Sequence, residues 1–269
     1  MAGTWTSGSE LNFIDSDDEV ITKWYRFDVN GNGNQKVVTH TFYYNGKTLR
    51  NYSLLYDKTK KAALWVAYAM NNDTYPHNVT RSDNWSYDPA LDQSWQPKLS
   101  KSYSPIKYER GHQVASNDRR TTRYQMYQTD YFSNMTPQRA EFNSGDDTEW
   151  DNLEERVQNL GYNSVSGGDT LYVVTGPIFG DGYTSGATDN NGAACPVPTQ
   201  YYKCIMKVHF SGGTAQSATG AAFLFDHESG ASRQDMTIDD LETLTGFDFF
   251  ANIPSGIQET AESKFTTFF

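Results

Sequence analysis

The chain has 269 residues, of which 37% are hydrophobic and 20% charged, so it can bury a large core and is not a disordered polar tail. No apolar run approaches the roughly 18 residues needed to cross a bilayer, and composition also excludes a coiled coil, a collagen and a disulfide-stabilised miniprotein. The formal net charge of −11 disfavours nucleic-acid binding through a broad basic surface, so any phosphate site must be local.

Residues 1–36 are polar and acidic, and we expect them to form an N-terminal extension to one domain that spans residues 37–269. The start, Met1 to Trp5, lacks the basic and apolar segments of a signal peptide. The low cysteine content and the abundance of Asn, Thr and Tyr nevertheless favour an exported protein, whether periplasmic, cell-surface or secreted, with its signal peptide absent from this sequence.

Short β-rich runs predict strands over residues 37–44, 52–56 and 64–70, and residues 57–61 between the last two are typical of a hairpin loop. Later runs predict three more strands over residues 170–175, 201–210 and 221–226. A long loop rich in Gly, Asn and Ala is expected at residues 180–198. Cys195 and Cys204 lie nine positions apart, and either a disulfide or two buried free thiols fits them.

Helical signals are fewer. Apolar residues within 150–160 recur at helical spacing and predict a helix that ends at Gly161. A Thr-x-x-Asp sequence that begins at Thr237 predicts the start of a second helix, which stops at Gly246. Because strands dominate without a βαβ rhythm, we predict an α+β fold with a mainly antiparallel central sheet and packed helices.

Residues 107–160 hold most of the side chains suited to chemistry. Inside an acidic chain, this segment combines one histidine and several amides with a cluster of cations, which indicates an anionic ligand, although a solvated polar face also accounts for it. The arginines concerned are Arg110, Arg119, Arg120, Arg123 and Arg139.

Several short blocks occur here in a fixed order: Glu109-Arg110-Gly111-His112, Ser133–Gln138, Phe142-Asn143 and Trp150 to Glu154. In this order they resemble the DNA/RNA non-specific endonuclease family, the ββα-metal nucleases marked by an Asp-Arg-Gly-His motif. Further blocks extend the resemblance over about residues 50–250, and these are Trp65–Tyr68, Arg81–Pro89, Val174–Pro177 and Val197–Lys203.

Hydrolysis of a phosphodiester needs a general base, positive charge on the phosphate oxygens and a stabilised leaving oxygen. The resemblance implies a ββα-metal (His-Me finger) site in which His112 is the general base. It implies Asn143 as the one direct protein ligand of Mg²⁺, with Mn²⁺ as a substitute, and both residue types suit these roles. It further implies Arg81 as a clamp on the scissile phosphate and Glu154 as the acceptor that holds the ion's water.

Substrate binding is predicted for three further residues of the segment 107–160, and these are Arg110, Asn134 and Arg139.

Two departures from the family pattern bear on this site. Glu109 stands where the family has Asp, and we expect its longer carboxylate to keep a structural or hydrogen-bonding role. Three extra residues follow Asn143, and one continuous helix would separate it from Glu154 by about 16 Å. We therefore predict a bulge or a delayed helix start around Gly145, with Asp151 as the alternative to Glu154.

The sequence thus predicts a metal-dependent endonuclease that hydrolyses DNA and RNA without strong base preference, because such sites read backbone phosphates. The alternative is a catalytically silent relative that binds a surface polymer, either a glycan or a nucleic acid. The acidic net charge, Glu109 and the extra residues after Asn143 favour that alternative, whereas the retained catalytic residue types favour the enzyme.

Overall fold

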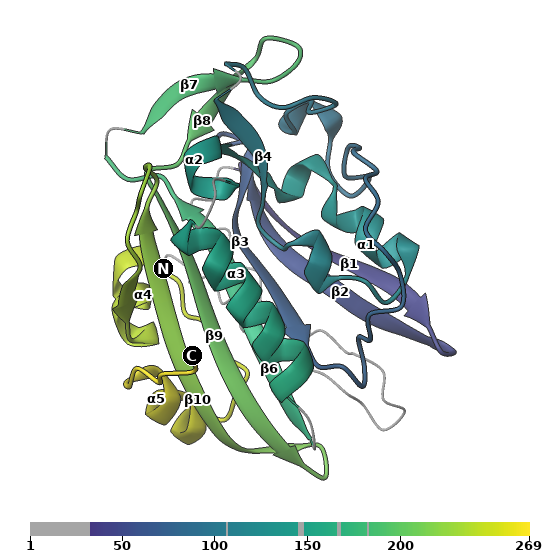
Figure 1. The fold of residues 1–269 in the computed structure, drawn as a ribbon, viewed down its shortest axis with the longest axis vertical. Coiled ribbons are helices and arrows are strands. Elements are labelled where there is room, and N and C mark those ends of the chain that lie inside the picture. Colours follow the sequence, from purple (N-terminus) through teal and green to yellow (C-terminus); the bar gives the residue numbers. More distant parts are fainter. Residues whose placement is uncertain (1–32, 106, 145–147, 166–167, 182) are drawn as a thin grey trace.

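The structure is a computed structural model that describes residues 33–269 apart from residues 106, 145–147, 166–167 and 182. The expected N-terminal extension, residues 1–36, lies outside the described residues except for its last four. The fold is built on a seven-stranded sheet in the order β1-β2-β3-β6-β9-β10-β11, in which every pair of neighbours is antiparallel (Figure 1). Its strands are β1 (Gln35–Tyr44), β2 (Lys47–Asp57), β3 (Ala62–Met70), β6 (Asp169–Ile178), β9 (Gln200–Ser211), β10 (Thr214–Asp226) and β11 (Gln234–Met236).

Both faces of this sheet are buried, which explains why its strands read as nearly continuous apolar runs. Along β6, Leu171 and Val173 pack into one core, and Tyr172 and Val174 pack into the other. The first core includes the apolar face of α3, and the second includes α4 and α5. In Figure 1 α3 crosses in front of β6 and β9, whereas α4 and α5 lie beside β10. The predicted α+β fold with a mainly antiparallel sheet is confirmed.

The helices are α1 (Arg123–Thr129), α2 (Ala140–Asn143), α3 (Glu149–Asn159), α4 (Ile238–Thr245) and α5 (Ser255–Glu262). As predicted, the Thr237 hydroxyl caps α4, and Gly246 ends it with a left-handed φ of 72°. The predicted end of α3 at Gly161 is wrong, because a π-turn (Leu160–Ser164) continues that helix. Gly161 is instead required for packing, since a Cβ there would lie 2.8 Å from the Cε of Met70.

The predicted loop at residues 180–198 is also wrong in part. It contains a hairpin of β7 (Thr184–Thr188) and β8 (Ala194–Val197), two short strands that lie outside the main sheet. Cys195 and Cys204 are both buried free thiols, so the disulfide alternative is excluded. Within the described ranges, no helix is long and apolar enough to span a bilayer.

Candidate active site

Two short strands and the helices that follow them support the candidate site. β4 (Tyr108–His112) and β5 (Met135–Arg139) pair antiparallel, α2 follows β5 directly, and together with α3 they form the predicted ββα arrangement. Strand patterns alone missed this pair because both sequences are polar and are interrupted by Gly111 and Pro137. Gly111 is needed because a Cβ at this position would overlap the buried side chain of Gln138.

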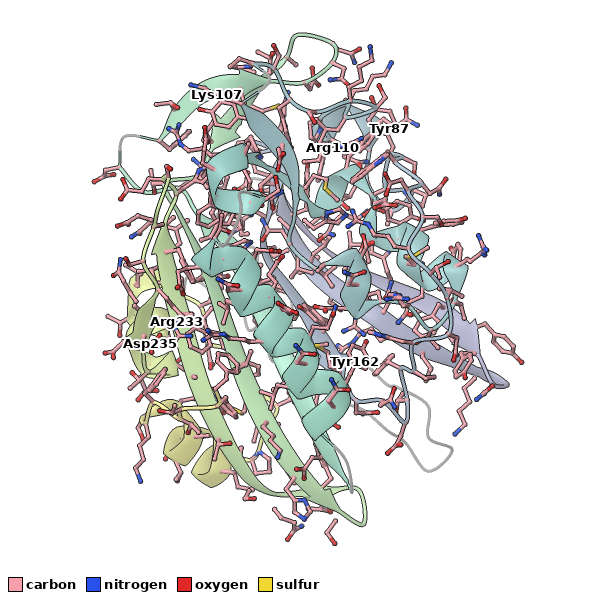
Figure 2. The ribbon with its side chains drawn as sticks, in the orientation of Figure 1. Tyr87, Lys107, Arg110, Tyr162, Arg233 and Asp235 are labelled. Carbon is pink, nitrogen blue, oxygen red and sulfur yellow. The ribbon has the colours of Figure 1, made fainter. Side chains whose placement is uncertain are left out.

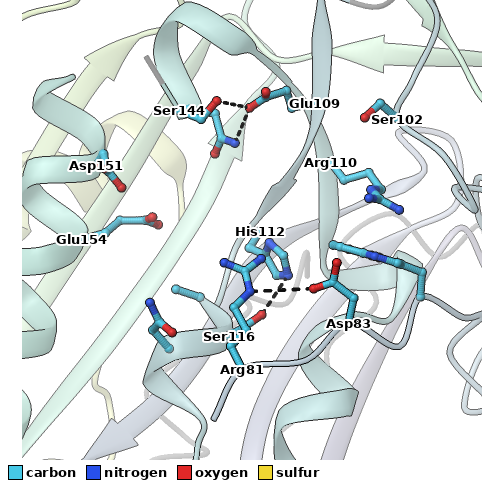
Figure 3. A pocket seen from close by; sticks show the side chains of 14 residues that line it. Arg81, Asp83, Ser102, Glu109, Arg110, His112, Ser116, Ser144, Asp151 and Glu154 are labelled. Atoms are coloured by element: carbon cyan, nitrogen blue, oxygen red, sulfur yellow. Dashed lines mark hydrogen bonds and ion pairs between the residues drawn. The ribbon is translucent and has the colours of Figure 1, made fainter. Parts of the chain in front are cut away.

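A pocket of about 460 Å³ opens between β4, the α2–α3 region and the segment that carries Arg81 (Figure 3). It brings together five of the seven predicted site residues. Its wall consists of Arg81, Asp83, Trp85, Ser102, Glu109, Arg110, His112, Ala115, Ser116, Asn117, Asn143, Ser144, Asp151 and Glu154. The remaining two predicted residues, Asn134 and Arg139, are not part of this wall.

The hydrogen bonds of His112 determine which of its ring nitrogens can act as a base. Its Nε2 lies 3.1 Å from Oδ1 of Asp130 and 3.2 Å from Oγ of Ser116. A carboxylate only accepts hydrogen bonds, so Nε2 carries the proton and donates a hydrogen bond to Asp130. In the neutral ring Nδ1 is then the nitrogen with a free lone pair, which makes it the basic atom of His112.

Asp130 is a functional residue that the sequence analysis missed. It is 1% exposed, and its second oxygen, Oδ2, accepts the backbone N–H of Asn84 at 2.7 Å. One buried carboxylate therefore orients His112 and also holds the segment that carries Arg81. No motif marks this residue, because it lies between the quoted blocks and contacts His112 only in the folded chain.

The amide of Asn143 is oriented by Glu109. Oε2 of Glu109 accepts Nδ2 of Asn143 at 2.8 Å and the hydroxyl of Ser144 at 2.7 Å. Because the carboxylate requires a donor, the amide oxygen of Asn143 points away from Glu109, and it accepts no hydrogen bond from the described residues. The expected hydrogen-bonding role of Glu109 is confirmed. This bond leaves the neutral amide oxygen of Asn143 facing away from Glu109, where it suits a hard cation.

Glu154 projects from α3 and faces the pocket from the side opposite His112 (Figure 3). Burial raises the pKa of its carboxyl group to about 7, although the nearby charge of Lys203 lowers it. The Nζ of Lys203, itself 1% exposed, lies 3.6 Å from Oε1 of Glu154, which is longer than a hydrogen bond. That oxygen is buried without a hydrogen-bond partner among the described residues, so the site lacks a donor that a hydrated cation would supply.

The expected delayed helix start is confirmed by the residues on either side of it. α2 ends at Asn143, and α3 begins at Glu149, where Oγ1 of Thr148 accepts the backbone N–H of Asp151. Gly145 lies outside the described residues. Because the chain restarts its helix, Asn143, Asp151 and Glu154 all reach one pocket, which a single continuous helix would not allow.

Two arginines lie at the rim of the pocket in different states. Arg81 is 51% exposed, and its Nε is 3.8 Å from Oδ1 of Asp83, so its guanidinium is only loosely held. Arg110 projects from β4 (Figure 2), with its Cζ 3.6 Å from the centre of the Trp85 ring and Nη1 donating to the carbonyl of Leu99. Arg81 is therefore able to turn toward an anion, whereas Arg110 is a fixed positive charge.

Asn134 and Arg139 lie outside the wall of the pocket, and both form hydrogen bonds within the protein. Asn134 is fully buried, and its side chain bonds to both the N–H and the carbonyl of Val114, two residues after His112. Arg139 donates its backbone N–H and its Nε–H to His227. Both residues therefore position the backbone around the site, and their role in substrate binding stays a prediction.

Comparison with known proteins places the whole arrangement in context. The model of the DNA/RNA non-specific endonuclease family matches residues 31–256. A nuclease from Nostoc sp. is 30% identical over 79% of this chain and 76% of its own length, and a nuclease from Serratia marcescens is 30% identical over 87% and 82%. A solved EndoG structure, from a complex with EndoGI, superposes with a TM-score of 0.60 at 20% identity and covers 82% of this chain and 89% of its own.

Proposed function

The chain belongs to the DNA/RNA non-specific endonuclease family, a family of metal-dependent nucleases, and on that premise we propose how its pocket hydrolyses DNA and RNA. The protein is an endonuclease, a hydrolase that acts on nucleic acid. In our proposal His112 is the general base, a Mg²⁺ ion binds to Asn143, and Arg81 holds the scissile phosphate. The observation that carries this proposal is that His112, Asn143 and Glu154 face one pocket.

The residues of the pocket fit a hydrated divalent cation. The amide oxygen of Asn143 would be the direct ligand, and the unpartnered Oε1 of Glu154 would accept a hydrogen bond from the ion's water. Asp151 lines the same pocket one turn earlier on α3 and is the alternative acceptor. A Mg²⁺ ion there, or Mn²⁺ in its place, supplies positive charge to the phosphate and to the leaving oxygen.

The protein's own groups account for the remaining steps. Nδ1 of His112 takes a proton from the attacking water as its oxygen forms a bond to phosphorus, and the imidazolium is stabilised by Asp130 through Nε2. Arg81 neutralises a non-bridging oxygen of the phosphate. The bond from phosphorus to the leaving oxygen then breaks, and that oxygen takes a proton from solvent. None of these contacts involves a nucleobase, so cleavage does not depend strongly on the nucleotide sequence of the substrate.

Two of the three sequence features that favoured a silent polymer-binding relative, Glu109 and the extra residues after Asn143, can be compared with the pocket. Glu109 orients the amide of Asn143, and the extra residues that follow Asn143 leave it in one pocket with Glu154. Both departures from the family pattern are therefore compatible with an active site.

The direct test is His112→Ala, assayed for plasmid DNA and RNA degradation with Mg²⁺ and Mn²⁺. Loss of a general base should reduce the rate by about 10²–10⁴-fold, with an unchanged thermal midpoint. His209→Ala is the matched control, because His209 is 48% exposed and bonds to Asp169, the first residue of β6, outside the wall of the pocket. Full activity of the His112 variant, or an inert wild-type protein with both ions, would refute the proposal.

A further inference from the structure

A second exposed surface lies beside the pocket, on α1 and the residues that precede it. The segment that carries Arg81 into the pocket runs along this helix. The backbone N–H of Asn78 donates to the carbonyl of Arg120 before α1 at 2.8 Å, and that of Asn84 donates to the side chain of Asp130 after it at 2.7 Å. The surface of α1 is therefore continuous with the Arg81 side of the pocket.

The charge of this surface is opposite to that of the chain. Residues 119–129 contain three arginines and no acidic residue, although the whole chain has a net charge of −11. Arg119 is fully buried and takes no part in the surface. Arg123 is exposed and has no ion pair with any described residue, and Arg120 donates its Nε–H to the carbonyl of Val79 at 2.7 Å. Two guanidinium groups thus remain available to an anionic partner.

Two tyrosines lie on the same face as these arginines. Tyr124 is 59% exposed and Tyr127 is half-buried, and their spacing of three residues places both side chains on one side of α1. Both rings are therefore accessible to a partner. We call Arg120, Arg123, Tyr124 and Tyr127 the α1 ridge.

Arginines beside accessible aromatic rings suit a single-stranded polynucleotide. Arginine binds its phosphates, and a tyrosine ring stacks on a base that is not already stacked in a duplex. A duplex offers its phosphates to the same arginines but no free base to the tyrosines. We propose that the α1 ridge binds a single-stranded segment of the substrate next to the scissile phosphate, so that the enzyme favours unpaired over duplex substrate. This inference rests on the proposed function of the adjoining pocket.

Binding is measured without cleavage, by fluorescence anisotropy in EDTA, with a labelled 20-nucleotide thymidine oligomer and a 20-base-pair duplex. Removing both rings in Tyr124→Ala/Tyr127→Ala should weaken binding of the single strand by about thirtyfold or more, because each ring would lose a stacked base. Duplex binding should change less than twofold. Tyr183→Ala is the matched control, since Tyr183 is 40% exposed and lies on the β6–β7 connection.

The arginines give an independent readout. Arg120→Gln/Arg123→Gln should weaken both substrates and reduce the slope of log Kd against log salt for the single strand by about 1.4, or 0.7 for each phosphate that the variant no longer neutralises. Arg233→Gln is the control, because Arg233 lies on the far side of α3 and pairs with Asp235 (Figure 2). If the tyrosine variant weakens binding of both substrates equally, or of neither, the α1 ridge does not distinguish single-stranded from duplex substrate. Failure of the pocket proposal looks different, because the wild-type protein would then bind the oligomer and cleave nothing with Mg²⁺ or Mn²⁺.

Discussion

Glu109→Gln tests whether the orientation of the Asn143 amide controls metal binding. In the wild-type protein Glu109 can only accept, at 2.8 Å from Nδ2 of Asn143 and 2.7 Å from the hydroxyl of Ser144. A glutamine can also donate, so the Asn143 amide can turn its nitrogen toward the pocket and still be satisfied. Loss of such support for a metal ligand typically costs about 10–100-fold in metal affinity. We therefore expect the Kd for Mn²⁺ to rise by about 10–100-fold, as measured by isothermal titration calorimetry without nucleic acid.

Two controls separate orientation from simpler effects. Ser144→Ala removes the other hydrogen bond of Glu109 but leaves the Asn143 contact, so its Kd should stay within about threefold of the wild-type value. Glu141→Gln removes a negative charge from the exposed side of α2, the helix that carries Asn143, and tests the effect of charge alone. The reasoning is refuted if Glu109→Gln binds Mn²⁺ as tightly as the wild-type protein, or if Glu141→Gln loses as much affinity.

Three further predictions concern the support of the site and the stability of the fold. Asp130→Asn should lower kcat by about 10–100-fold with little change in KM, because the amide holds the His112 ring less firmly; a change in KM alone would contradict this. Gly111→Ala should destabilise the protein by more than about 2 kcal/mol in urea unfolding, and adding Gln138→Ala should recover stability, since the two side chains compete for one space. Burial raises the pKa of Glu262 from its ordinary 4.5 to about 8, so the folded state retains this proton and stability falls as pH rises between these values. Glu262→Gln should therefore stabilise the protein by about 2 kcal/mol at pH 8 and very little at pH 5, and an equal gain at both pH values would exclude this cause.

The sheet was predictable from the sequence because its strands are buried on both faces. Residues such as those of 170–175 and 201–210 form apolar, β-rich runs, and the hairpin at residues 57–61 follows from its turn residues. The start and end of α4 were predictable for a local reason as well, since Thr237 and Gly246 satisfy its terminal backbone groups within a few positions in the sequence.

The elements that sequence reasoning missed depend on long-range contacts. β4 is a polar strand whose glycine is required by the side chain of Gln138 on β5, and nothing local indicates that contact. The end of α3 was misplaced because Gly161 serves the packing of Met70 and not the end of a helix. The bonds of Asn134 were not predictable either, because its amide joins the backbone of Val114, two residues after His112, to the carbonyl of Thr129 on α1.

An acidic chain can cleave a polyanion because the charges that matter lie within a few ångströms of the phosphate. At physiological ionic strength a surface charge is largely screened beyond about 8 Å, so most of the net charge of −11 acts on encounter and not on the bound substrate. Behind the pocket wall, the buried Asp130 is paired with His112. Within the wall, Glu109 accepts two hydrogen bonds and Asp83 lies 3.8 Å from Arg81. The carboxylates of Asp151 and Glu154 remain, and they repel a phosphate unless a cation lies between. We therefore propose that a metal in this pocket would have two functions, because it would supply charge for the reaction and would also remove the repulsion that an acidic pocket imposes on its own substrate.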